Sequence, residues 1–259
     1  MRGGDKIEKV IDKEMMNNKG TLMRIIQVNS LSDIVVEFQD KYNFRKRTTY
    51  SNFKRGQVKN PYDITVYGVG AVGEGKYKTW ERGHITTAYS IWADMLRRCY
   101  SEKIKDKQLA YFGIVTVCDK WKIYQNFAEW YEKNKYFVNE RLHLDKDILY
   151  PGNTIYSPKT CLLVPQKINE QFHYTPKDNG IPTGVSLTNT GTYSATCNGK
   201  YLGTYQTLEK AYEIYSAEKE RVVKEMADDY IGIIPNKVYT ALYDYKFLLE
   251  NDKNYRRTA

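Results

Sequence analysis

Hydrophobic positions recur with two different spacings along this chain, and each spacing predicts a different kind of element. Two β-branched runs, LMRIIQV at 22–28 and IVVEFQD at 34–40, predict strands separated by the turn-like NSLSD. Between 86 and 100, apolar residues recur every three or four positions, which predicts a helix capped by Thr86 or Thr87. The apolar face of that helix comprises Ala88, Ile91, Trp92, Met95, Leu96 and Cys99.

The middle of the chain predicts a second amphipathic helix and then a short series of strands. Residues 121–133 form the helix, and its aromatic stripe is expected to lie in the core. That stripe comprises Trp121, Tyr124, Phe127, Ala128 and Tyr131. The series that follows is a strand at 142–149, a turn at 150–153, a strand at 161–165 and a brief helix at 166–174.

The last third of the chain alternates short strands with turn residues and ends in helices. Strands are expected at 183–189, 192–199 and 200–207, and a long helix at 207–230 begins at the capping residue Thr207. Pro235 separates a final helix at 237–250. These patterns predict an α+β fold with a small β-barrel-like domain at 1–78, a mixed domain with flanking helices at 79–176, and a three-stranded antiparallel sheet with helices at 177–259.

A glycine-rich segment follows the first predicted strands. It contains Gly68-Val69-Gly70-Ala71-Val72-Gly73, which matches the GxGxxG pattern of dinucleotide-binding loops. Such a loop must open a helix between parallel strands, whereas here EGKYKTWERG follows without a helical period. The segment is therefore predicted to be a flexible connector between domains rather than a cofactor site.

The charge balance favours a polyanionic partner. The chain of 259 residues carries 40 Lys and Arg against 31 Asp and Glu, a formal net charge of +9. Residues 1–78 hold 15 basic and 9 acidic residues, a balance of +6, while 176–259 hold 11 of each. A basic surface of this kind points to nucleic acid, although the excess charge also serves solubility.

Basic residues interleave with aromatic ones between 41 and 59. This composition suits a surface that binds phosphates and stacks bases, but it equally suits a small sheet with aromatic core and charged exterior. Two further arginines lie near the end of the 86–100 helix. The candidate DNA-binding residues from these segments are Arg45, Lys46, Arg47, Lys54, Arg55, Arg97 and Arg98.

Cysteine spacing and hydropathy exclude several classes of protein. The 4 cysteines form no CxxC pair, which argues against a zinc cage or a disulfide framework and fits a reducing compartment. No apolar run approaches the ~18 residues of a membrane span, and the charged first residues contain no signal-peptide core. A cytoplasmic protein with no membrane partner is expected.

The stretch LHLDKDILYPGN at 142–153 carries the most specific candidate chemistry. His143, Asp145 and Asp147 are two residues apart, so in a strand their side chains share one face. An imidazole beside two carboxylates can bind a metal ion, and it can also be the solvated face of a strand. Neighbouring motifs favour the metal site.

The sequence TGVSLTNTGTYSATCNGKYLGTYQTLEKAYEIYSAE resembles the ethylene-response-factor (APETALA-type) DNA-binding domain. The match includes Gly184-Val185, Tyr193, Ala195 and the run at 201–205, and it implies a three-stranded sheet that faces the DNA major groove. That family favours Arg at many contact positions, whereas this chain has small polar residues, which predicts weak DNA binding by this module alone. The residues that the resemblance places at the DNA are Thr183, Ser186, Thr188, Thr190, Thr192, Thr196, Asn198 and Tyr201.

The sequence LDKDILYPGNTIYSPKTCLLVPQKIN is similar to His-Asn-His (HNH) homing endonucleases of phages and introns. The resemblance implies a ββα-metal motif in which Asp145 and Asn169 are metal ligands and His173, on the same helix face as Asn169, is a further one. The middle Asn of the motif has a possible counterpart in Asn153. Lys146 occupies the position of the general-base histidine, and lysine is almost fully protonated near pH 7. His143, on the Asp145 face, is the candidate that replaces it.

This resemblance implies a divalent-metal-dependent nuclease that nicks or cleaves double-stranded DNA. Mg²⁺ is the cofactor expected for oxygen ligands, and a histidine ligand also admits Mn²⁺ or Zn²⁺. The catalytic candidates are Asp145, His143 as base, and Lys146, which with Arg97 or Arg98 would steady the phosphate charge. Two alternatives stay open: a catalytically inactive DNA-binding regulator or anti-defence factor on the same scaffold, and a module that captures a host protein.

Overall fold

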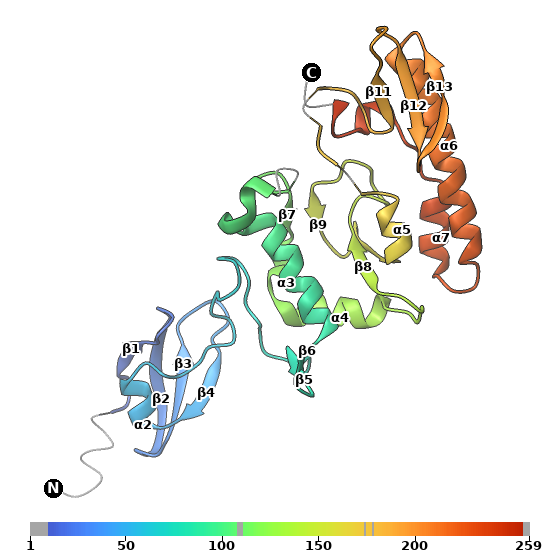
Figure 1. The fold of residues 1–259 in the computed structure, drawn as a ribbon. Coiled ribbons are helices and arrows are strands. Elements are labelled where there is room, and N and C mark those ends of the chain that lie inside the picture. Colours follow the sequence, from blue (N-terminus) through green and yellow to red (C-terminus); the bar gives the residue numbers. More distant parts are fainter. Residues whose placement is uncertain (1–9, 108–110, 174, 178, 256–259) are drawn as a thin grey trace, which may run out of the picture. The chain divides into compact units, whose positions relative to one another are not determined.

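A computed structural model describes residues 10–107, 111–173, 175–177 and 179–255, and its fold is α+β, as predicted (Figure 1). Tyr174, the last residue of the predicted 166–174 helix, and the outermost residues of the first and third predicted domains lie outside these ranges. The chain divides into two compact units, one of residues 1–113 with 119–129 and one of residues 114–118 with 130–259. The finer division into three domains stays a prediction.

The first unit contains a four-stranded antiparallel sheet in which each strand pairs with the next along the chain. Every second residue of the third strand is buried, so one face of the sheet packs on a core that includes Met23, Ile34 and Phe53. The elements are β1 (Glu14–Met16), β2 (Leu22–Ser30), β3 (Asp33–Phe38), β4 (Arg45–Thr48) and the short helix α2 (Tyr50–Lys54).

The expected β-barrel at 1–78 is wrong, because the described part of the chain contains no closed barrel. Closure requires the two edge strands to pair with each other. Here β1 and β4 are the two edges, and β1 has only 3 residues, all exposed. One covered face buries the apolar residues of β2 and β3, so the sheet remains open.

The glycine-rich segment is packed rather than flexible, which corrects the expected connector. Gly70 lies so close to the next helix that a Cβ there would be 2.5 Å from Cδ1 of Leu96 and 3.0 Å from the Trp92 ring. The side chain of Gln125 accepts a hydrogen bond from Tyr77 N (3.0 Å) and donates one to Tyr77 O (2.8 Å). The glycines are therefore explained by close approach of the backbone to side chains.

The helix predicted at 86–100 is α3 (Thr87–Tyr100), and its six predicted core residues are all buried. Thr86 caps it by accepting a hydrogen bond from Tyr89 N. The helix predicted at 121–133 begins later, as α4 (Tyr124–Asn134), because a 3₁₀ turn precedes it; its aromatic stripe is buried as predicted. The remaining elements here are β5 (Trp80–Glu81), β6 (His84–Ile85), η1 (Glu102–Lys107) and η2 (Asp119–Lys122).

The second unit begins with two small pairs of strands. β7 (Thr116–Val117) runs parallel to β9 (Ile155–Tyr156), and β8 (Leu142–Asp145) runs antiparallel to β10 (Leu162–Pro165). The helix α5 (Gln166–Glu170) follows β10 directly and lies beside β8 (Figure 1). Buried residues of this unit, including Val164 and Ile168, pack with Val223 and Leu242 in one core cluster.

The strand expected at 142–149 ends at Asp145, because that residue forms a turn. Its Oδ1 accepts hydrogen bonds from the backbone N–H groups of Asp147 (2.8 Å) and Ile148 (2.7 Å). An aspartate that binds the backbone two and three residues ahead competes with a strand ladder and bends the chain. Asp147 therefore does not share the strand face of His143 and Asp145.

The end of the chain contains the predicted three-stranded sheet, ordered β11 (Val185–Leu187), β12 (Tyr193–Cys197) and β13 (Lys200–Tyr205). The long helix α6 (Leu208–Asp229) covers one face of it, and Thr207 caps this helix by accepting from Lys210 N (Figure 1). The core between them comprises Val185, Ala195 and Cys197 from the sheet and Ala211, Tyr212 and Tyr215 from the helix, with Ile181 beside them.

The final predicted helix, 237–250, is shorter than expected. The structure has α7 (Asn236–Tyr243), then an irregular segment, then η3 (Leu249–Asn251). Tyr245 and Phe247 are two residues apart and both contact Phe172, with ring centroids 4.9 and 5.7 Å from it. Side chains two residues apart share a face in extended backbone but not in a helix. Tyr245 and Phe247 can therefore both pack on Phe172 only if the helix ends before them.

Gly184 offers a stability test of the contact between this sheet and α6. It has φ +77°, and a Cβ there would lie 2.1 Å from the Tyr215 ring. Gly191 is the matched control, with φ +79° and nothing within 4 Å of an added Cβ. Both Gly→Ala changes strain the backbone, but Gly184→Ala is expected to cost about 1–3 kcal/mol more because it also overpacks the core. Chemical denaturation measures the difference; equal losses would show that Tyr215 moves aside freely.

Candidate functional site

The candidate site is built on one face of β8. His143 and Asp145 alternate with the buried Leu142 and Leu144, so the two polar side chains point away from the hydrophobic core. Antiparallel pairing places His143 opposite Val164, and α5 begins two residues after Val164. The strand, its partner and the helix thus converge on the polar side chains of β8.

Asn169 of α5 reaches this face. Its Nδ2 lies 3.4 Å from Nδ1 of His143, although the two residues are 26 positions apart in the sequence. The amide can also present its oxygen in this position, since the two orientations differ only by a flip. The structure therefore brings His143 and Asn169 into contact, and Asp145 lies two residues from His143 along the same face of β8.

The Asp145 carboxylate lies in an environment that favours its protonated form. Burial, together with the negative charge of Asp147, raises the pKa of Asp145 from 3.8 to about 6. The two backbone hydrogen bonds to its Oδ1 and the nearby Lys146 oppose that rise without cancelling it. A partly desolvated carboxylate of this kind attracts a cation strongly.

The burial of Asp145 predicts a pH dependence of stability in metal-free buffer. Because the folded pKa is above the unfolded value, the folded state binds the Asp145 proton more tightly than the unfolded state. The stabilisation that Asp145 gives the folded state is therefore complete below about pH 4, near its unfolded pKa of 3.8. It is lost as the pH rises through the folded pKa of about 6.

The free energy of unfolding of the wild type is expected to fall by up to about 3 kcal/mol relative to Asp145→Asn over that interval. Denaturant titrations at pH 4 and pH 7, with chelator present, measure it. Parallel pH profiles for the two proteins would contradict the raised pKa.

Lys146 is a structural residue in this fold. Its side chain is 3% exposed, and Nζ donates to Asp147 Oδ1 (2.6 Å) and to Asn153 O (2.7 Å). Asn153 closes the loop from the other side, since its Nδ2 donates to Lys146 O (2.9 Å) and Ile155 O (2.8 Å). A buried ammonium that donates to these two acceptors holds the 146–153 loop closed.

His173 is not on a helix face with Asn169, which corrects that expectation. The helix α5 ends at Glu170, and residues 171–173 continue in turns closed by hydrogen bonds such as His173 N to Glu170 O (3.2 Å). His173 instead lines a cavity beside Phe172. Within the described ranges, no three His, Cys, Asp or Glu residues are grouped so that they could hold one metal ion.

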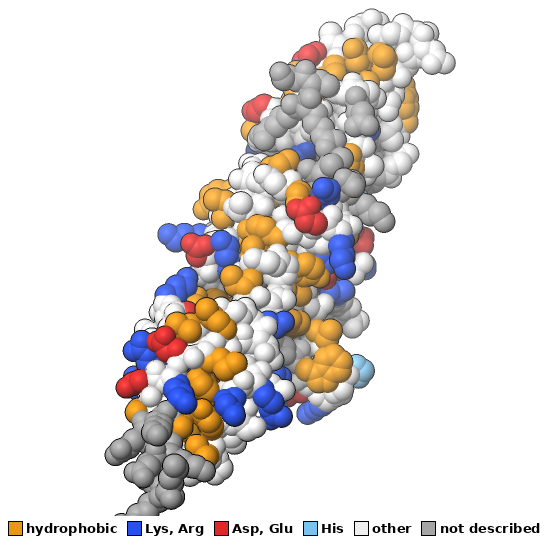
Figure 2. Space-filling model, turned by 90° about the vertical axis from the view of Figure 1, so that its left-hand side faces the viewer, with side chains coloured by type: hydrophobic (Ala, Val, Ile, Leu, Met, Phe, Trp, Pro, Cys, Tyr) orange, Lys and Arg blue, Asp and Glu red, His pale blue; other side chains and the backbone are white. Residues whose placement is uncertain are grey.

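The candidate DNA-binding residues between 45 and 55 are exposed, and two of them are neutralised by neighbouring carboxylates. Arg45 pairs with Glu37 at 2.7 Å, and Arg47 pairs with Asp33, across β3 and β4. The Arg47 guanidinium lowers the pKa of Asp33 to about 2. Lys and Arg side chains lie among hydrophobic ones on this part of the face drawn in Figure 2. Such exposed pairs are weak, so phosphates can replace these carboxylates.

The other basic candidates have neighbours of their own. Arg55 donates to Asn52 Oδ1 at 3.0 Å, and Lys54 lies 5.5 Å from the centroid of the Tyr50 ring. On α3, Arg97 pairs with Asp94 at 2.9 Å, and Arg98 lies over the Tyr111 ring. Lys46 is exposed on the edge strand β4.

The sheet face opposite α6 is rich in hydroxyl groups. Register places Ser186, Ser194 and Thr204 in one row across the three strands, and Thr196 opposite Tyr201 in the next. Thr188, Thr190 and Thr192 join their hydroxyls in a cluster with O–O distances of 2.7–3.1 Å. This face offers neutral donors and acceptors to a polar partner.

Asn198 is held by residues that sequence reasoning did not single out. Its Nδ2 donates to Gln171 Oε1 (3.1 Å), and the buried Lys219 of α6 donates to Gln171 Oε1 (2.8 Å) and Asn198 Oδ1 (3.3 Å). Burial lowers the pKa of Lys219. The sequence did contain a signal, because Lys219 follows Tyr215 by four residues and precedes Val223 by four on the buried stripe of α6.

No protein-family model matches the chain, and neither a curated protein nor a solved structure matches it. Among the described helices, none is both long enough and apolar enough to cross a lipid bilayer.

Proposed function

We propose that this protein binds double-stranded DNA and cleaves or nicks it with a divalent metal ion, as an endonuclease of the HNH type. The observation that supports the proposal is the contact of Asn169 on α5 with His143 on β8, whose strand face also carries Asp145. An antiparallel strand pair followed by a short helix is the arrangement that the sequence resemblance implies. Here it brings an amide to an imidazole, with a carboxylate two residues away on the same strand face.

The residues present fit a hard divalent cation. Asp145 and Asn169 can supply oxygen ligands, which Mg²⁺ prefers, and the desolvated carboxylate of Asp145 supplies the charge. A bound Mg²⁺ would supply Lewis-acid stabilisation of phosphate charge. Mn²⁺ or Zn²⁺ would use the His143 imidazole as a further ligand.

His143 is the residue proposed to take the proton from the attacking water. An imidazole titrates near neutral pH, so it can accept this proton at working pH. Asn169 orients the His143 ring from α5, at 3.4 Å from its Nδ1. Lys146 holds the loop that shapes Asp145, and it acts through that position rather than on the substrate.

DNA affinity is proposed to come from two surfaces with different chemistry. The basic residues of β4 and α2 contribute phosphate contacts in the first unit, and these contacts weaken as salt rises. The hydroxyl face of the β11–β13 sheet contributes neutral hydrogen bonds, in the way implied by the ethylene-response-factor resemblance. The second surface alone is expected to bind weakly.

A plasmid-nicking assay tests the proposal. Supercoiled DNA is incubated with the full chain in Mg²⁺, in Mn²⁺ and with excess chelator, and conversion to the open-circular form is followed. We expect conversion with metal and none with chelator. Cleavage that is indifferent to the chelator would remove the metal-dependent mechanism.

A second candidate function is DNA binding without catalysis, and the fixed position of Lys146 favours it. Lys146 stands at the usual position of the base, where it is buried and binds Asp147 and Asn153. A structural role of this kind is expected in a protein that keeps the scaffold without catalysis. This function predicts salt-sensitive DNA binding that survives chelation and no nicking under any metal. Filter binding at low and moderate salt, beside the nicking assay, separates the two functions.

A further inference from the structure

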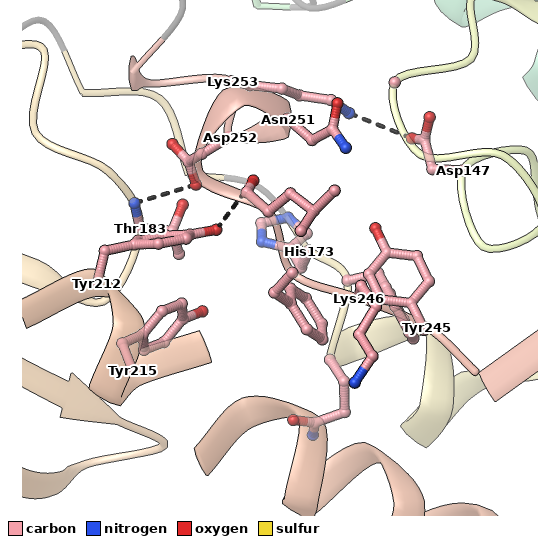
Figure 3. Close-up of a pocket in the computed structure, with 15 residues that line it drawn as sticks. Asp147, His173, Thr183, Tyr212, Tyr215, Tyr245, Lys246, Asn251, Asp252 and Lys253 are labelled. Carbon is pink, nitrogen blue, oxygen red and sulfur yellow. Dashed lines mark hydrogen bonds and ion pairs between the residues drawn. The ribbon is translucent and has the colours of Figure 1, made fainter. Parts of the chain in front are cut away.

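A cavity of about 100 Å³ lies in the second unit, against the loop that carries Asp145. Its walls come from α6, from the segment after α5 and from the segment between α7 and the end of the described chain (Figure 3). Asp147, His173 and Thr183 line it and were singled out by sequence. Further lining residues are Phe172, Tyr212, Tyr215, Tyr245, Lys246 and Lys253.

Aromatic rings form opposite walls of this cavity. Figure 3 shows Tyr212 and Tyr215 on one side and Tyr245 on the other, with His173 between them. Tyr245 and Phe172 pack edge to face, with ring centroids 4.9 Å apart. Aromatic walls of this kind bind a planar ring by stacking, whichever base the ring belongs to.

Two hydroxyl groups in the cavity have unused hydrogen-bonding capacity. Neither the Tyr215 nor the Tyr245 hydroxyl makes a hydrogen bond to another residue in the part of the chain that the structure describes. Both hydroxyls belong to residues that line the cavity, so a ligand with a polar edge can hydrogen-bond to them.

Charged side chains of both signs line the cavity, two lysines (Lys246 and Lys253) and two aspartates (Asp147 and Asp252). Lys246 pairs with Glu220 (2.7 Å) and Lys253 pairs with Asp147 (3.2 Å), and their side chains are 57% and 33% exposed. Asp147 also accepts from Lys146, so Lys253 can turn to another anion without leaving a carboxylate unpaired. A phosphate is an anion of suitable size and charge for this exchange.

The size of the cavity suits a single ring system. A volume of about 100 Å³ holds roughly seven to ten water-sized groups, which is enough for one nucleobase. Aromatic walls, hydroxyl groups that line the cavity and two lysines at its rim together suit a planar heterocycle attached to a phosphate. That description fits a nucleotide.

We infer that this cavity receives a single unpaired nucleobase, turned out of the DNA beside the His143, Asp145 and Asn169 site. The inference rests on the proposed DNA-binding function and deepens it, because it names an extruded base as part of the substrate. Extrusion costs least where a base is already unpaired. The protein is therefore expected to prefer DNA with a bulged base to fully paired DNA.

The test compares two duplexes of the same mixed sequence, one fully paired and one with a single bulged 2-aminopurine. Binding to the full chain is measured by anisotropy with chelator present, and 2-aminopurine fluorescence reports stacking. We expect the wild type to bind the bulged duplex about tenfold more tightly, with quenched fluorescence, since each stacked base contributes to this extent.

Three variants identify the cavity as the source of the preference. Tyr245→Ala is expected to abolish the preference and the quenching, while affinity for paired DNA is unchanged. Tyr215→Phe keeps the ring and removes only the hydroxyl, and it is expected to reduce the preference about threefold. Tyr243→Ala removes an exposed tyrosine outside the cavity and should leave both readouts as in the wild type. Thermal denaturation confirms that each variant folds.

The possible failures are distinguishable. Equal affinity of the wild type for both duplexes overturns the cavity inference and leaves the proposed DNA binding in place. Absence of binding to either duplex overturns both. A fourth measurement adds deoxyadenosine monophosphate alone; quenching of tyrosine fluorescence by this nucleotide, without preference for the bulged duplex, would make a free nucleotide the ligand and overturn the extruded base.

Discussion

Replacement of Asp145 with asparagine is expected to lower Mg²⁺-dependent nicking at least about a hundredfold, because a metal ligand supports several kcal/mol of charge stabilisation. The substitution is nearly isosteric. The amide oxygen of the new side chain can still accept from Asp147 N and Ile148 N, so the turn after β8 is retained. What is lost is the negative charge that would hold the cation. Initial nicking rates on supercoiled plasmid, over a range of Mg²⁺ concentrations, measure the effect.

The matched control is Asp244→Asn, which removes an exposed carboxylate at the end of α7 in the same unit. Its rate should equal that of the wild type. DNA binding in chelator should also be the same for both variants, because Asp145 is not proposed to contact DNA without the metal. If Asp145→Asn nicks DNA as fast as the wild type does, the assigned centre is not the nuclease site.

Replacement of Lys146 with methionine is expected to lower the free energy of unfolding by about 3–5 kcal/mol, the usual cost of removing one partner from a buried ion pair. The ammonium is nearly inaccessible and binds both Asp147 and Asn153 O. Without it, Asn153 O loses a donor, and Asp147 depends on Lys253 at 3.2 Å. Chemical denaturation of the wild type and the variant gives the difference.

Lys200→Met is the control for this change, since Lys200 is 64% exposed and pairs with Glu218 on the surface. That loss should stay below about 1 kcal/mol. Nicking by folded Lys146→Met then separates structure from chemistry. If nicking activity falls only in proportion to the folded fraction, Lys146 has a structural role. If the variant is well folded and inactive, Lys146 takes part in catalysis.

Asp145 and Lys146 belong to one loop but have different roles in it. Residues 145–153 bend through the Asp145 turn and are closed by Lys146 and Asn153, so the strand face and the loop are stabilised by different residues. Asp147 connects them to the cavity, because Lys146 and Lys253 bind its two oxygens. A base in the cavity would therefore sit against the loop that orients the carboxylate.

The spacing of apolar residues along the chain was sufficient to predict helices and strands whose buried face depends only on residues nearby in the sequence. The buried face of α3 agrees with the predicted set residue by residue, because side chains three and four apart share a helix face whatever lies opposite. The caps Thr86 and Thr207 and the three final strands follow from equally local signals.

Only the tertiary structure decided which distant side chains meet. The approach of Asn169 to His143 depends on the register of β8 with β10 and on where α5 begins, and a helix that ends at Glu170 removes His173 from that face. Whether Lys146 faces solvent or Asn153 is settled by loop closure. The cavity requires α6, Phe172 and the residues after α7 to be assembled at once. The periodicity of a sequence indicates which face of its own helix or strand a side chain lies on. Contacts between elements depend instead on which distant segments of the chain come together.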